Sequence, residues 1–179
     1  MRIIDLSQPL YTGMPVFPGD PKVRVDIVHT RDANGWELRR LELGSHTGTH
    51  VDAFSHMHDG GGTLDQMPLS RFFGKARLVW TDSADWPSET GLFFARETGI
   101  EAADKLIACK PGFVGGALTE PLQRALLGCG IVTYTDLVNL ELLPVDRDFW
   151  FYGFPLKIKD GDGSPVRAVA IVADEDKSL

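Results

Sequence analysis

Four of the five histidines in the 179-residue chain lie within thirteen residues, from His46 to His58. No other stretch of the sequence concentrates side chains that can bind a metal ion or transfer a proton. Four such side chains occupy even-numbered positions, on His46, His50, Asp52 and His56. Side chains alternate along an extended strand, so these four would project to one side. On a helix, Asp52 would point roughly 200° away from His50. The spacing therefore predicts an extended segment that directs all four into one pocket.

The residue types in this register favour metal chemistry. Two imidazoles and one carboxylate form the ligand set of many catalytic zinc, manganese and iron sites, which keep an open position for water. The other interpretation is a solvated polar loop that is rich in histidine by chance. His29 lies far from this cluster at the end of an expected strand, where a structural role is the simpler interpretation.

The surrounding pattern predicts a mixed α/β unit that presents this segment. Alternating apolar residues predict strands, and apolar residues at helical spacing predict amphipathic helices. A Pro- and Gly-rich stretch, Tyr11–Pro21, is expected to be a constrained loop. Expected strands cover Arg2–Leu6, Val23–His29, Trp36–Leu43 and Arg77–Trp80; expected helices cover Glu101–Ala108 and Thr119–Leu127; and Phe149–Ile158 with Val166–Val172 should form a hairpin around residues 160–163.

A family resemblance becomes visible at the histidine cluster. Residues 46–56 resemble the H-x-G-T-H-x-D-x-P-x-H signature of the metal-dependent cyclase family, which includes bacterial kynurenine formamidases and isatin hydrolases. The likeness extends to residues 5–21, to the Gly60–Asp65 segment with Pro68 and Leu69, and to Ser164–Ala168. The resemblance implies a single cyclase-like domain over residues 1–179, of α/β class, with a mixed barrel-like sheet and peripheral helices of the swivelling β/β/α type.

The resemblance also implies roles for individual residues. His46, His50 and Asp52 match the family's metal ligands, and a divalent cation held there could lower the pKa of a bound water and polarise a carbonyl. His56 matches the residue that transfers protons, with a surface or ligand-supporting histidine as the alternative. Phe17 occupies a position where related formamidases carry a tryptophan against an aromatic substrate, and simple packing is its other interpretation.

The chain departs from the family pattern after residue 58. No histidine follows His58, so the later histidine of a two-metal centre is absent. Gln123 stands near that position, and Thr135, beside Asp136, stands where the family has a glutamate. Phe54 replaces the proline of the motif. We therefore expect one divalent ion, zinc or manganese, with Gln123, Asp136 and Glu120 as candidates for an extra ligand or orienting group, or else as helix-end and surface residues.

Composition excludes several classes of partner. The net charge of −7 argues against binding to a nucleic-acid backbone, which requires a basic face. No apolar run approaches the ~20 residues that span a bilayer, and the N-terminus lacks a signal-peptide pattern. Two cysteines are too few for a disulfide framework, which favours a reducing cytoplasm. By resemblance, we expect a homodimer or homotetramer in which the Tyr11–Pro21 loop reaches a neighbouring subunit.

Two functions are consistent with these features. The first is a metal-dependent hydrolase that opens a small amide, such as an N-formyl aryl amine or an isatin-like cyclic amide, by attack of activated water with His56 moving the proton. The second is a non-catalytic relative that binds a metal or ligand and has lost part of the active site. Retention of His56 beside all three ligand positions favours the hydrolase.

Overall fold

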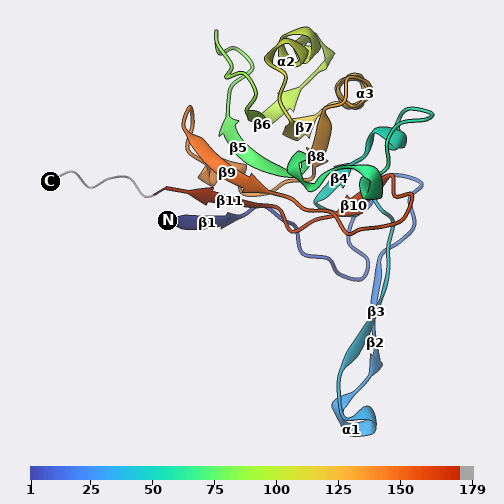
Figure 1. Ribbon diagram of the computed structural model, residues 1–179. Helices are drawn as coiled ribbons and strands as arrows, with labels where there is room; N and C mark the ends of the chain where they lie inside the picture. Colours follow the sequence, from blue (N-terminus) through green and yellow to red (C-terminus); the bar gives the residue numbers. More distant parts are fainter. Residues whose placement is uncertain (174–179) are drawn as a thin grey trace, which may run out of the picture.

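The computed structural model describes residues 1–173, and nine of their strands form one mixed, curled sheet (Figure 1). The strand order is β1-β11-β9-β5-β6-β7-β8-β4-β10. The pairs β5–β6, β6–β7 and β7–β8 are parallel, and the other pairs are antiparallel. The strands are β1 (Arg2–Asp5), β4 (His50–Asp52), β5 (Phe73–Leu78), β6 (Gly91–Thr98), β7 (Phe113–Leu118), β8 (Val132–Thr135), β9 (Asp148–Tyr152), β10 (Gly163–Pro165) and β11 (Val169–Val172).

Two helices cover the parallel part of the sheet (Figure 1). α2 (Ala103–Cys109) connects β6 to β7, and α3 (Glu120–Gly128) connects β7 to β8. Pro121 lies in the first turn of α3, where a missing N–H costs no helical hydrogen bond. Leu106, Leu122 and Leu126 are fully buried against the sheet. Short 3₁₀ helices span Phe54–His56, Leu64–Gln66, Leu69–Arg71, Ile100–Ala102 and Leu140–Leu142.

A second apolar cluster involves β4, β5, β6, β8, β9 and β11, and aromatic rings dominate its centre. Phe93, Phe151 and Tyr134 are fully buried, with ring centroids of neighbouring pairs 4.8–4.9 Å apart. The Tyr134 hydroxyl donates to the Gly153 carbonyl at 2.9 Å, and burial raises the pKa of this phenol well above its usual value. Val51 of β4 belongs to the same cluster, so the core anchors the strand that carries the histidine motif.

A two-stranded arm projects from the body (Figure 1). β2 (Arg24–His29) and β3 (Leu38–Glu42) pair with each other and with no strand of the large sheet among the described residues. The short helix α1 (Arg31–Asn34) lies at the tip. Thr12 ties the preceding loop to the arm, because its hydroxyl accepts a hydrogen bond from Val25 N–H at 2.8 Å.

The fold expected from the sequence is confirmed in its main features: a mixed sheet, few helices, the strands near residues 2–6, 23–29 and 36–43, and both helices. Two expectations were wrong. The strand expected at Arg77–Trp80 begins earlier, at Phe73. β9 and β11 do pair, but residues 160–163 are not a tight turn between them. The chain instead forms β10, which pairs with β4 of the histidine motif.

In the described residues, none of the helices combines the length and apolar character needed to cross a membrane.

Candidate metal centre

The alternating register predicts one continuous extended segment, but the histidine motif does not form one. Only His50–Asp52 form a strand, and His56 lies in a 3₁₀ helix that begins after Ala53. His46 lies in a turn that precedes Gly48. Gly48 adopts a left-handed φ of 59°, and a Cβ there would contact Leu10 and Met14. The backbone therefore bends on both sides of β4, and these bends bring the side chains together.

The three predicted ligands come together, because both imidazole rings lie close to one oxygen of the Asp52 carboxylate. Asp52 Oδ1 lies 2.9 Å from His46 Nδ1 and 3.4 Å from His50 Nε2. Nδ1 of His50 lies 2.6 Å from the Gly48 carbonyl, which can accept its N–H, so that the lone pair of the ring lies on Nε2. The donor atoms of the three residues all lie within 4.8 Å of one another. Two imidazole nitrogens and one carboxylate oxygen in this arrangement suit a divalent cation.

Two threonines of the neighbouring strand β8 support these ligands. β8 pairs with β4, and the register places Thr133 opposite Asp52 and Thr135 opposite His50. The Thr133 hydroxyl donates to Asp52 Oδ2 at 2.7 Å, and both side chains are fully buried. The Thr135 hydroxyl lies 2.7 Å from His50 Nε2. Thr135 therefore touches the site through a neutral hydroxyl.

Burial, hydrogen bonds and neighbouring charges shift the pKa values of three site residues. Burial alone would raise the pKa of Asp52, but hydrogen bonds with His46, His50 and Thr133 hold it far below its usual range. Burial opposes a charge on His46 as well, yet its contacts with Asp52 and Asp162 outweigh this effect and raise the pKa of the ring. For His56, burial followed by repulsion from His46 lowers the pKa. A neutral His56 is thus favoured beside an acidic site.

Asp162 is a site residue that the sequence analysis did not identify. Its Oδ2 lies 2.9 Å from His46 Nε2 and 3.5 Å from His56 Nδ1. Among the described residues, His46, His56 and Asp162 form a second group with the spacing of metal ligands. The only local signal was the acidic, Gly-rich stretch at residues 160–163, which also has the composition of a turn.

Pairing between β10 and β4 explains how Asp162 reaches the motif. Gly163 lies opposite Asp52, and Ala53 N–H donates to the Asp162 carbonyl at 2.8 Å. A Cβ at Gly163 would collide with the His46 imidazole, so this close approach requires glycine. The Ser45 hydroxyl adds a 2.9 Å bond to Asp162 Oδ1. Two segments far apart in the chain thus form one polar pocket.

The other predicted site residues lie apart from these two groups. Phe17 is 72% exposed in the loop before β2. Gln123 donates to the Leu118 carbonyl at 2.9 Å, and Glu120 pairs with Arg124 one helical turn away. Asp136 is exposed at the end of β8, and its backbone carbonyl accepts a hydrogen bond from Thr49. In the part of the chain described here, neither metal-capable group includes any of these side chains.

Neighbouring polar residues have structural partners. His58 Nε2 lies 2.7 Å from the Arg124 carbonyl, which links the motif segment to α3. Asp65 accepts hydrogen bonds from the Thr63 hydroxyl and from the Asp160 backbone N–H. His29 packs edge-on against Trp36 in the arm, as a structural residue would. Asp65 therefore steadies the loop that carries Asp162 and does not contact an imidazole directly.

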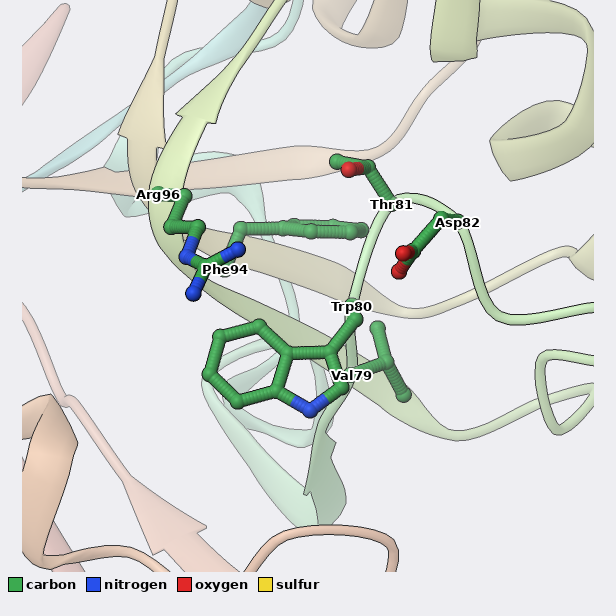
Figure 2. Close-up of a pocket in the computed structure, with 6 residues that line it drawn as sticks. All are labelled: Val79, Trp80, Thr81, Asp82, Phe94 and Arg96. Atoms are coloured by element: carbon green, nitrogen blue, oxygen red, sulfur yellow. The ribbon is translucent and has the colours of Figure 1, made fainter.

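A small cavity is formed without any of the metal-capable residues. Figure 2 shows the residues that line it. It has a volume of about 100 Å³ and forms where β6 passes the segment that follows β5. The guanidinium of Arg96 lies over the Trp80 ring, 4.9 Å from its centroid, a cation–π contact. Its lining residues are Val79, Trp80, Thr81, Asp82, Phe94 and Arg96. None of these belongs to either histidine group, so the cavity is separate from the candidate chemistry.

Comparison with known proteins identifies the family of this chain. The family model described as "Putative cyclase" matches residues 4–107. A kynurenine formamidase of Salinibacter ruber is 31% identical over 207 residues, which cover 94% of this chain and 97% of the relative. A kynurenine formamidase of Bacillus cytotoxicus is 23% identical, with 93% and 95% covered.

Solved structures show the same fold. Isatin hydrolase A from Labrenzia aggregata, solved with benzyl benzoate, superposes with a TM-score of 0.84 at 23% identity, covering 97% of this chain and 94% of that one. A protein described as a potential metal-dependent hydrolase with cyclase activity superposes with a TM-score of 0.75 at 22% identity, covering 97% and 99%.

Proposed function

Because the chain belongs to the cyclase family, we propose that it is a metal-dependent hydrolase that opens a small amide bond. The observation that carries this proposal is the convergence of His46, His50 and Asp52 on one point, with the His56 ring in contact with that of His46. The names of the relatives, kynurenine formamidase and isatin hydrolase, indicate the substrate class: an N-formyl aryl amine or a cyclic aryl amide.

His46, His50 and Asp52 would hold one divalent ion, zinc or manganese. When bound, this ion supplies a Lewis acid that polarises a carbonyl and makes water more acidic. Three ligands leave a position open, as catalytic sites require. Within the described residues, the side chains predicted as further ligands do not reach this group, which favours a single ion.

His56 is proposed as the proton-transfer residue. It is half-buried, and its ring lies 3.8 Å from that of His46, measured between centroids. Its lowered pKa keeps the ring neutral near pH 7, so that it can accept a proton from water and return it to the leaving amine. Phe17 is proposed as an aromatic wall for the substrate; its exposure leaves the ring available for such a contact.

The proposal is tested by assaying metal-reconstituted protein with N-formylkynurenine and with isatin. We expect turnover of at least one substrate and its loss, by about 10²-fold or more, in His56→Ala, with the metal content unchanged. His58→Gln is the matched control, because His58 belongs to the same segment but contacts α3. One equivalent of metal per chain and no turnover of either substrate would instead support a non-catalytic relative.

We also propose that the chain forms a homodimer or homotetramer through the β2–β3 arm and the loop tied to it. Cross-strand partners on one face of the arm include Val25 opposite Leu41 and Ile27 opposite Arg39. Ile27 and Leu41 are 51% and 61% exposed. A two-stranded hairpin is at best marginally stable alone in water, so its apolar face favours a covering partner, here a second copy of the chain.

A further inference from the structure

Asp162 lies close to two histidines with different proposed roles, a metal ligand and a proton-transfer residue. Its Oδ2 lies between Nε2 of His46, a candidate ligand, and Nδ1 of His56, the proposed proton-transfer residue. The two rings lie close together, tilted by an interplanar angle of 33°. One carboxylate oxygen therefore faces both rings, although Asp162 comes from a segment more than a hundred residues later in the chain.

His46 has acceptors on both of its nitrogens. Nδ1 faces Asp52 and Nε2 faces Asp162, each at 2.9 Å. A neutral imidazole has one N–H and one free lone pair. The two metal-capable groups share His46, so its single lone pair can serve only one of them at a time. A cation in one group leaves the other nitrogen as a hydrogen-bond donor.

Burial and support favour the group with His50 and Asp52. The Asp52 side chain is 1% exposed and is held by Thr133, whereas the Asp162 side chain is 47% exposed. His50 is oriented by the Gly48 carbonyl. A cation held by these residues uses Nδ1 of His46, and Nε2–H is then directed at Asp162. Ligating histidines commonly donate their second N–H to a carboxylate in this way.

We propose that Asp162 is a positioning residue of the metal centre. Its carboxylate accepts the Nε2–H of His46, so that Nδ1 is presented to a divalent cation together with His50 and Asp52, and the same oxygen holds His56 against the ring. The proposal rests on the proposed function only in requiring that the site bind a cation. Catalytic turnover is not needed to test it.

The backbone around Asp162 suits this role. Ser45 binds the other carboxylate oxygen, and the Asp162 carbonyl accepts from Ala53 N–H within the motif itself. Gly163 leaves no Cβ in the way of the His46 ring. The carboxylate is therefore held from both sides at the ring edge, which is what tautomer selection requires.

The experiment measures Zn²⁺ affinity of metal-free protein by competition with a chelating dye, without substrate. Asp162→Ala is expected to weaken binding by about 10- to 100-fold. Asp162→Asn keeps an acceptor oxygen and should restore part of this loss. Asp160→Asn is the matched control from the same loop; its left-handed backbone, with φ of 55°, suits asparagine, and its affinity should equal that of the wild type.

A second readout identifies the ligating nitrogen. In the zinc-loaded protein, ¹⁵N NMR of the histidine rings should show His46 protonated at Nε2 and ligated through Nδ1. In Asp162→Ala, the Nε2–H signal should lose the chemical shift and the exchange protection of a hydrogen bond to a carboxylate. Wild-type affinity in Asp162→Ala, or ligation through Nε2 in the wild type, would overturn the proposal. So would binding of two Zn²⁺ per chain with one lost in Asp162→Asn, because Asp162 would then be a ligand.

Discussion

The Asp52 carboxylate shows how a buried charge is maintained in this protein. Burial favours its neutral form, yet hydrogen bonds with two imidazoles and one threonine reverse that preference and lower its pKa. Each partner comes from a different place: His46 from a turn, His50 from β4 and Thr133 from β8. A carboxylate satisfied in this way can remain charged and available to a cation.

Thr133→Val tests the contribution of the buried hydroxyl. Valine has a similar shape but no donor, so Asp52 Oδ2 loses its 2.7 Å partner inside the protein. We expect the free energy of unfolding of the metal-free protein to fall by about 1–3 kcal/mol, measured by denaturant titration. Thr90→Val removes only a local bond to Ser88 and should cost less than about 0.5 kcal/mol. Equal losses in both variants would contradict this interpretation.

Strand β4 has three residues, but its neighbours on both sides make it the organising element of the site. β8 provides the threonines that support its ligands, and β10 brings Asp162 and Gly163 to the His46 ring. Its middle residue, Val51, is fully buried in the core. The alternation of the strand therefore places one side chain in the core between two that face the site.

The β2–β3 arm allows a test of the proposed assembly. Leu41 lies on the apolar face of the arm, whereas Glu42 is paired with Arg24 on the other face. We expect the wild type to sediment as a dimer or tetramer at micromolar concentration. Leu41→Gln should shift it toward monomer, and Glu42→Gln, a change to the same residue one position away, should not. A wild-type monomer in sedimentation velocity would refute the proposed assembly.

Contacts between distant parts of the chain hold the molecule together. β1 pairs with β11, so the beginning and the end of the described chain lie side by side. A bidentate ion pair links the two ends: Arg167 donates to Asp5 through Nε at 2.9 Å and through an η nitrogen at 2.7 Å. The metal centre depends on the same kind of long-range contact, because His46 and Asp162 meet only through sheet pairing.

The Asp5–Arg167 pair predicts a pH dependence of stability. The bond from Arg167 lowers the pKa of Asp5 below its unfolded value of 3.8. The stabilisation is therefore fully present above that unfolded value and is lost as the pH falls through the lower, folded pKa. Asp5→Asn should be less stable than the wild type at pH 7, and urea unfolding should show this difference shrinking toward pH 2. A difference that stays constant over this range would exclude the ion pair as its cause.

Local pattern was sufficient for many features of this protein. The types and order of the motif residues predicted the metal-capable group, alternation predicted β1 and the arm, and helical spacing with Pro121 predicted α2 and α3. These features depend on residues close together in the chain, where side-chain period and caps act directly. β6 and β7 begin with short apolar runs, and β8 mixes valine and tyrosine with threonine. Periodicity alone does not separate such short segments from helix.

Tertiary contacts decided how the motif residues meet and which further residue joins them. A single extended register could not anticipate the left-handed bend at Gly48 or the 3₁₀ turn at His56. Asp162 resembled part of a turn, because acidic residues and glycines are typical of turns. This composition does not indicate that the segment contacts residues more than a hundred positions away. Only the pairing of β10 with β4 places its carboxylate at the edge of the His46 ring.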